Sequence, residues 1–496
     1  MAALHTLSFG ACLQTILREK QCSISHLTQK MGKKSQTTVS RVINDQCSYK
    51  AAKEFYGQLL LTNFLHLTTG EIDALNRSLE INRIGLDAYR AYQSMWEIFL
   101  TDQMNLDDYS LQDLFYQNQH QSTLASLLHT LQNAEYIEGF LFNCYEVKPL
   151  VALIDQLFGS AKAPPLSVYH YFEVGSQPQH AVDALLCISK LALYDGYEAF
   201  CRVLPDAVSN DSFPIYKNMI RLWATSRDGS AQTYELYAAT DGRMYLDAHP
   251  ANGHSFAAAK EIIVSNAEKY LPVRNQYGAP ERGANLLLLS ERLLFLEKDR
   301  SLRLLWHTMC ISCVPPDIFA ALLTIAASNL GLDFESEFAK KIIKVHIERY
   351  KNIFEKKYTT QMLLEKGSMR HFAQTGYIKD HPLGVPPLSA DQRIRMLETL
   401  IDAAKSNVYF HLYISKKEEF MQHLDFICID NLGLYLYDSN ANYNMQRRHF
   451  DALISIDMLT DCFNNFFDHE LLANHVHSKQ ESILFLESLK QELRDA

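Results

Sequence analysis

The segment from Ser23 to Asn44 most constrains what this chain can fold into, because it has the pattern of two short helices joined by a tight turn. Ser23 and Ser35 are each placed to cap the start of one helix. Gly32 can adopt the left-handed conformation that ends the first helix. Apolar residues at helical spacing would lock the two helices together, and these are Leu27, Met31, Val39, Val42 and Ile43. The pattern predicts a closely packed helix pair.

The second helix of this pair, over Gln36–Asn44, carries polar side chains away from its apolar face. Gln and Arg can bond base edges with two hydrogen bonds, whereas Ser, Thr and Lys suit phosphate groups. The start of a helix adds backbone N–H groups and a positive dipole end. The candidate DNA contacts are Lys33, Lys34, Ser35, Gln36, Thr37, Thr38, Ser40, Arg41 and Asn44. These residues predict double-stranded DNA as a partner.

The run Thr38-Val39-Ser40-Arg41-Val42-Ile43-Asn44 resembles the recognition-helix pattern T-V-S-R-V-L-N of LacI-type regulators. The run Leu27–Gly32 resembles the stretch that precedes the turn in that group. A helix over Ser8–Lys20 comes before the pair, which is more similar to the Cro/repressor (XRE-like) group. The resemblance covers about residues 8–67 and implies a helix-turn-helix DNA-binding domain. The turn is about one residue longer than usual, so the resemblance does not fix which residues contact bases.

Charge is unevenly spread along the chain. Residues 1–66 contain eight Lys and Arg against three Asp and Glu, a net charge of +5. Because the whole chain has a formal net charge of −10, the remainder carries −15. A small basic segment on a large acidic chain suits a polyanionic partner at one end only, although lysines clustered by chance on a solvated face would give the same count.

Residues 1–67 are therefore interpreted as an all-α helix-turn-helix domain, completed by a helix over Ala51–Leu65. Thr68 and Glu71 stand in a capping-box arrangement that predicts another helix from Thr69. A helix over Leu86–Leu100 follows, with a broad apolar face. We interpret residues 68–115 as a helical connector, with a dimerisation surface or the first core helix of the next domain as the alternatives for Leu86–Leu100.

Strand patterns and helix patterns are mixed along residues 116–496, which predicts a large mixed α/β (α+β) body. Ser167–Val174 and Asn407–Ile414 have strand patterns, and Asp241-Gly242 and Asp430–Gly433 each stand between strand-like runs, which is typical of hairpins. Helices are expected over Ala181–Phe200, Ser336–Glu355, Ala390–Lys405 and Ser478–Leu493. Pro315-Pro316 is a candidate break, so two subdomains split near residue 315 are one organisation of this body.

No known catalytic or cofactor motif is found in the body. The P-loop, dinucleotide-binding, zinc-protease and nucleophile-elbow patterns have no match. Cys310 and Cys313 have a C-x-x-C spacing, but only the flanking His307 could add a third zinc ligand, so buried thiols are the preferred interpretation. We therefore expect no catalytic residues, no metal site, no cofactor and no enzymatic activity, and the sequence identifies no ligand-binding residues.

Together these features predict a DNA-binding transcriptional regulator, repressor-like in type, that acts as a homodimer on paired half-sites. The body would sense a small molecule or a protein effector. An enzyme, or an interaction protein, tethered to DNA by its N-terminal domain is the alternative. No signal peptide and no apolar run of about 18 residues is found, so we expect no membrane partner and a cytoplasmic location.

Overall fold

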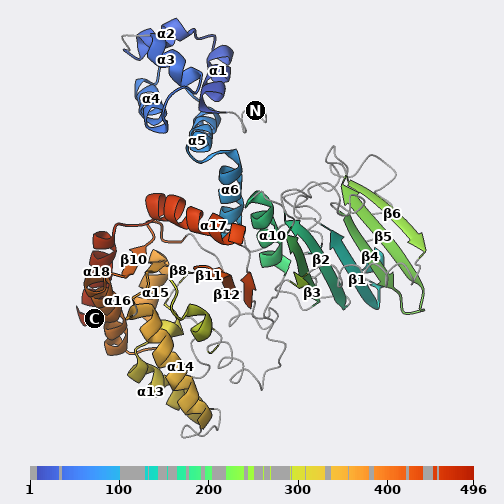
Figure 1. Ribbon diagram of the computed structural model, residues 1–496, viewed down its shortest axis with the longest axis vertical. Helices are drawn as coiled ribbons and strands as arrows, with labels where there is room; N and C mark the ends of the chain where they lie inside the picture. Colours follow the sequence, from blue (N-terminus) through green and yellow to red (C-terminus); the bar gives the residue numbers. More distant parts are fainter. Residues whose placement is uncertain are drawn as a thin grey trace. The chain divides into compact units, whose positions relative to one another are not determined.

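The computed structural model describes residues 8–32, 36–100, 129–131, 133–142, 154, 165–174, 178–191, 196–203, 219–238, 244–250, 261, 268–269, 291, 293–307, 309–329, 337–355, 357–378, 385–419, 424–438, 451–454 and 457–495. The chain divides into two compact units, Met1–Ser94 and Met95–Ala496. Helices make up the described part of the first unit, and two mixed sheets with their helices make up the second (Figure 1).

The first unit, which we call the N-terminal helical unit, forms at the positions that the sequence pattern predicts. Its helices are α1 (Phe9–Glu19), α2 (Ile24–Lys30), α3 (Gln36–Ile43), α4 (Tyr49–Thr62), α5 (Thr69–Ile84) and α6 (Leu86–Leu100), the last crossing the unit boundary. The Ser23 hydroxyl caps α2, and Thr68 and Glu71 form the expected capping box on α5. Gly32 adopts a φ of +61°, as the predicted end of α2 requires.

The core of this unit includes α5 as well as the first four helices. Phe9, Leu13 and Ile16 of α1 are completely buried, and Leu75 of α5 lies in the same cluster. The helix pair thus belongs to one larger helical core, and the domain boundaries drawn from the sequence stay a prediction.

Sheet A, the first sheet of the second unit, has seven described strands in the order β6-β5-β4-β1-β2-β3-β7. They are β1 (Tyr136–Phe142), β2 (Leu166–Val174), β3 (Tyr197–Val203), β4 (Met219–Thr225), β5 (Ala231–Ala238), β6 (Met244–Pro250) and β7 (Glu268–Lys269). Strands β1, β2 and β3 run parallel, and the other pairs are antiparallel. The antiparallel pairing of β5 with β6 confirms the strands of the first predicted hairpin, whose Asp241-Gly242 lies outside the described residues.

One helix predicted in this region is confirmed only in its first part, and its C-terminal end was wrong. The sequence suggested a helix over Ala181–Phe200, but α10 ends at Leu191 (Pro178–Leu191) and β3 begins at Tyr197. Gly196 lies so close to β2 that a Cβ there would stand 1.5 Å from the carbonyl oxygen of Leu166. This close approach lets the following residues pair with β2, and pairing with another strand overrode the local helical pattern.

Sheet B has six described strands in the order β10-β9-β8-β11-β12-β13. They are β8 (Leu302–Trp306), β9 (Thr360–Leu364), β10 (Phe410–Ile414), β11 (Leu424–Ile429), β12 (Gly433–Asp438) and β13 (Asp451–Ile454). Strands β8, β9 and β10 are parallel, whereas β11 and β12 form the second predicted hairpin. The strand predicted from Asn407 starts later, at Phe410, because Asn407 ends the preceding helix and its side chain donates to the Phe354 carbonyl.

Helices cover both faces of sheet B (Figure 1). On one face its strands share a core with α13 (Pro316–Asn329), α14 (Glu337–Phe354), α15 (Lys366–Thr375), α16 (Ala390–Ser406) and α18 (Lys479–Asp495). On the other face Phe426 of β11 stacks on Phe463 of α17 (Asp457–Phe466), with ring centroids 5.7 Å apart. The helices predicted at 336–355, 390–405 and 478–493 are confirmed as α14, α16 and α18.

A buried histidine on α14 makes the stability of sheet B's helical layer depend on pH. The ring of His346 stacks on Phe319 at 3.7 Å, and its Nε2 atom lies 2.8 Å from the Val314 carbonyl oxygen. Burial lowers the pKa of His346 from 6.5 to about 4; the charge of Arg349 acts in the same direction, and the hydrogen bond to Val314 opposes them. The neutral imidazole is therefore the form that the fold accommodates.

We expect acid to destabilise this layer between pH 6.5 and pH 4, because the unfolded histidine binds a proton in that window and the folded one does not. Above pH 6.5 the His346 imidazole is neutral in both the folded and the unfolded chain, so its full contribution to the free energy of unfolding is present. The contribution lost between pH 7 and pH 5 is about 2 kcal/mol. Urea unfolding at the two pH values, compared with His346→Gln, checks this, since glutamine keeps an N–H donor but cannot titrate. An equal pH dependence in the variant would contradict it.

Candidate nucleic-acid interface

The two faces of α3 have opposite exposure. Val39 is completely buried, and Val42 and Ile43 are each 2% exposed, so these side chains join the core of the N-terminal helical unit. From the facing helix, Leu27 of α2 is also completely buried. The apolar residues that the sequence analysis assigned to the helix contact are thus confirmed as core residues.

The opposite side of α3 is polar and faces solvent. Gln36, Thr37, Thr38, Arg41 and Asn44 are exposed, and Ser40 is half-buried. The Asn44 amide donates to the Ser40 hydroxyl at 3.3 Å, which links two candidate contacts one helical turn apart. The structure therefore brings these six predicted residues together along α3 and its C-terminal end. Lys33, Lys34 and Ser35 lie outside the described residues.

Asp45, directly after this polar surface, fixes the direction of α3. It has a left-handed backbone conformation with a φ of +54°. Its carboxylate accepts hydrogen bonds from the Ser8 hydroxyl, from the Gly10 backbone N–H at 2.8 Å and from the Asn82 amide at 2.9 Å. One side chain thus connects the end of α3 to α1 and α5. Sequence reasoning missed this positioning residue, and an Asp directly after a predicted helix end was the signal for it.

Gly10 is the point of closest approach between α1 and α3. A Cβ at this position would stand 2.2 Å from the Ile43 carbonyl oxygen, which is far inside van der Waals contact. The Gln14 amide, one turn later on α1, donates to the same carbonyl at 3.0 Å. The end of α3 is therefore held against α1 by backbone contact as well as by side-chain hydrogen bonds.

Gly10→Ala should destabilise the N-terminal helical unit by about 1–3 kcal/mol, because a backbone atom and not a flexible side chain must move. Gly57→Ala is the matched control, since no atom lies within 4 Å of a Cβ on that glycine of α4. The control should stabilise α4 by up to about 1 kcal/mol. Hydrogen exchange of the α1 and α3 amides in the full chain measures both effects. Equal protection in the two variants would contradict the tight contact.

The basic residues of this unit divide into structural and solvent-facing groups. Lys20 is structural, because its ammonium lies 3.1 Å from the Glu71 carboxylate and donates to the His66 carbonyl at 3.2 Å. Partial burial works to raise the pKa of Glu71, but hydrogen bonds from Thr68 and Lys20 outweigh it and hold this pKa below its ordinary value. Among the described residues of this unit, the exposed basic side chains are those of Arg18, Lys30, Arg41, Lys50, Lys53 and Arg90.

The described residues contain no group of three or more His, Cys, Asp or Glu side chains that could hold a metal ion. Cys310 and Cys313 are both buried, at 2% and 1% exposure. Burial raises the pKa of Cys313 well above its usual value, and the neighbouring Cys310 acts in the same direction. This agrees with the preferred interpretation of the pair as buried thiols. Among the helices that the structure describes, none is long and apolar enough to cross a membrane.

Comparisons with known proteins give little similarity. No protein-family model matches the chain, and the search of curated proteins found no match. Polyphosphate kinase from Porphyromonas gingivalis is among the solved structures that match, with 11% identity and a TM-score of 0.19. The match covers 75% of this chain and 51% of the kinase, so the chain spans about half the length of that protein.

These comparisons correct the function predicted from the sequence. None of the comparisons, the match to a polyphosphate kinase included, supports the prediction that the chain is a transcriptional regulator with a sensing body, and we withdraw that prediction. Because the TM-score is only 0.19, the similarity carries no argument about the fold or activity of this chain.

Proposed function

We propose that the N-terminal helical unit binds double-stranded DNA, with α3 lying in the major groove. The observation that carries this proposal is the division of α3 into a buried apolar side and an exposed polar side. The proposal concerns DNA binding by this unit and assigns it no role in transcription.

The side chains on the exposed side have the chemistry that base edges require. An arginine such as Arg41 can donate two hydrogen bonds to guanine, and Gln36 and Asn44 can each pair with adenine through donor and acceptor together. All three are exposed. Ser40 and Thr37 are short hydroxyl residues suited to phosphate oxygens. The resemblance of residues 8–67 to helix-turn-helix domains supports the same placement.

A rigid support for α3 favours recognition over loose electrostatic attachment. Asp45 ties its C-terminal end to α1 and α5, and the close contact at Gly10 leaves little freedom to shift. A helix held in this way presents its side chains at fixed positions, so that the cost of ordering them on binding is small. The net charge of +5 over residues 1–66 adds a sequence-independent attraction to phosphate.

The test is to select duplexes from a random-sequence pool with the full chain, and then to measure binding of the selected duplex by fluorescence anisotropy over a salt series. We expect a shared sequence among the selected duplexes and a linear fall of log affinity with log salt concentration. An unselected duplex of the same length is the control for non-specific binding. A pool that yields no shared sequence, or an affinity for the duplex that salt does not change, would overturn the proposal.

A further inference from the structure

The carboxyl ends of the parallel strands of sheet B each lead into a polar residue at the same edge of the sheet. His307 follows β8, Glu365 follows β9 and Ser415 follows β10. These three strands are hydrogen-bonded neighbours with the same direction, so the three residues reach the same edge of the sheet. In open α/β sheets, ligands bind outside this edge, at the point where the strand order reverses. Here the order reverses at β8, because β9 pairs with one side of this strand and the later strand β11 pairs antiparallel with the other side.

A serine, a histidine and a glutamate lie within hydrogen-bonding distance of one another at this edge. The Ser368 hydroxyl, in the first turn of α15, donates to Oε2 of Glu365 at 2.7 Å. Nε2 of His307 lies 3.1 Å from the same carboxylate oxygen and 3.2 Å from the Ser368 hydroxyl oxygen. A nucleophile and a base in mutual contact is the arrangement that covalent catalysis requires.

Neighbouring groups hold this cluster in place. Asp425, which is completely buried at the start of β11, accepts the His307 backbone N–H at 2.6 Å. The Ser415 hydroxyl accepts the Lys366 backbone N–H at 2.9 Å. A Cβ on Gly367 would stand 2.6 Å from the Glu418 carbonyl oxygen, so the start of α15 is pressed against that segment. The position of Ser368 is therefore fixed from two sides.

The exposure of the three groups suits reaction with a molecule from solvent. Glu365 is completely buried, whereas the His307 side chain is 27% exposed and Ser368 is half-buried. A buried carboxylate costs free energy unless it is hydrogen-bonded, and here its oxygen is held by the two groups that can also reach solvent. A site with this combination of burial and access is a candidate for function.

We propose that Ser368 is a nucleophile for acyl transfer, and that its substrates are small carboxylic esters. The Ser368 oxygen forms a bond to the ester carbonyl carbon, and the bond from that carbon to the leaving oxygen breaks. The hydroxyl proton goes to Nε2 of His307, which then gives it to the leaving oxygen, while the Glu365 carboxylate stabilises the imidazolium that forms between these two transfers. The products are an acylated serine and an alcohol.

The experiment treats the full chain with a fluorophosphonate probe, which forms a bond from phosphorus to the serine oxygen and releases fluoride and a proton. We expect the probe mass on the tryptic peptide that contains Ser368, and loss of labelling in Ser368→Ala. Ser406→Ala, at an exposed serine on α16, is the matched control and should label like the unaltered chain. His307→Gln and Glu365→Gln should each slow labelling by about 10²-fold or more.

A chain that is not labelled, or one labelled at another serine, would overturn the proposal. Labelling that is equally fast in His307→Gln and Glu365→Gln would overturn the roles given to these two residues. Mapping the probe in the unaltered chain needs no variant, so the decision on Ser368 does not depend on whether Ser368→Ala folds. Hydrolysis of p-nitrophenyl acetate by the same samples then shows whether the acylated serine is released by water.

Discussion

Replacing Gln36 and Arg41 together with alanine should weaken binding of the full chain to its selected duplex by about 30-fold or more. Both side chains are exposed on α3, where they would contact bases. Each lost base contact costs about 1–3 kcal/mol, and two independent contacts therefore cost about 2–6 kcal/mol. Because neither side chain belongs to the core, the helical content of the variant should equal that of the unaltered chain.

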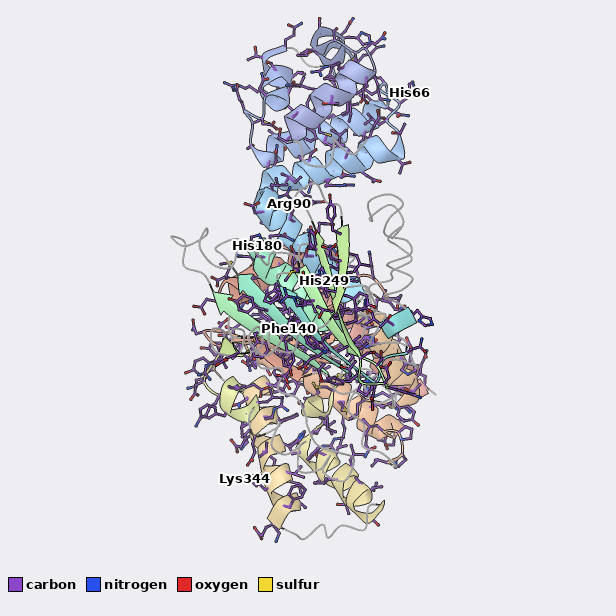
Figure 2. All side chains as sticks on the ribbon, turned by 90° about the vertical axis from the view of Figure 1, so that its right-hand side faces the viewer. His66, Arg90, Phe140, His180, His249 and Lys344 are labelled. Atoms are coloured by element: carbon purple, nitrogen blue, oxygen red, sulfur yellow. The ribbon has the colours of Figure 1, made fainter. Side chains whose placement is uncertain are left out.

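The control for this variant removes the same residue types elsewhere in the N-terminal helical unit. Gln58 on α4 and Arg90 on α6 are both exposed, and Figure 2 labels Arg90. The control pair Gln58→Ala and Arg90→Ala loses the same formal charge as the test pair. Its affinity for the selected duplex should change by much less, while both pairs should bind an unselected duplex with similar affinity. Equal losses in the two pairs would mean that α3 contributes only charge.

The helix pair could be predicted from sequence because its signals are local. Ser23 and Thr68 each cap the start of a helix, and Gly32 follows the end of one. Each of these residues acts within one turn of its helix end. The apolar spacing of α3 likewise identifies which residues are buried without reference to the rest of the chain. The support for α3 could not be predicted from local signals, because Asp45 accepts hydrogen bonds from Gly10 and Asn82. These residues are separated from Asp45 by 35 and 37 positions in the sequence.

The body was harder to predict because its decisive contacts are between distant residues. A helical pattern continued through Gly196, but pairing with β2 made the following residues a strand. His307 and Ser368 lie 61 positions apart in sequence and meet only because β8 and β9 are neighbouring parallel strands. No spacing rule links a histidine that follows β8 to a glutamate and a serine that follow β9, so motif searching found no site here.

The body also contains a buried ion pair whose disruption should have the largest effect on stability. Arg349 of α14 donates two hydrogen bonds to the Glu297 carboxylate, at 3.1 and 2.8 Å. The side chains of Arg349 and Glu297 are 9% and 1% exposed. Neither charge can be hydrated where it lies, so each depends on the other for compensation.

Arg349→Met should destabilise the body by about 3–5 kcal/mol, because it leaves the Glu297 carboxylate buried and without its partner charge. Replacing both residues, with Glu297→Leu added, should recover most of that loss, since an apolar pair of similar volume carries no desolvation cost. Urea unfolding followed by tryptophan fluorescence measures this, because Trp306 lies in the same core as Ile353 and Phe354 of α14. A double variant as unstable as Arg349→Met would show that the loss comes from packing around the arginine stem and not from the unpaired carboxylate.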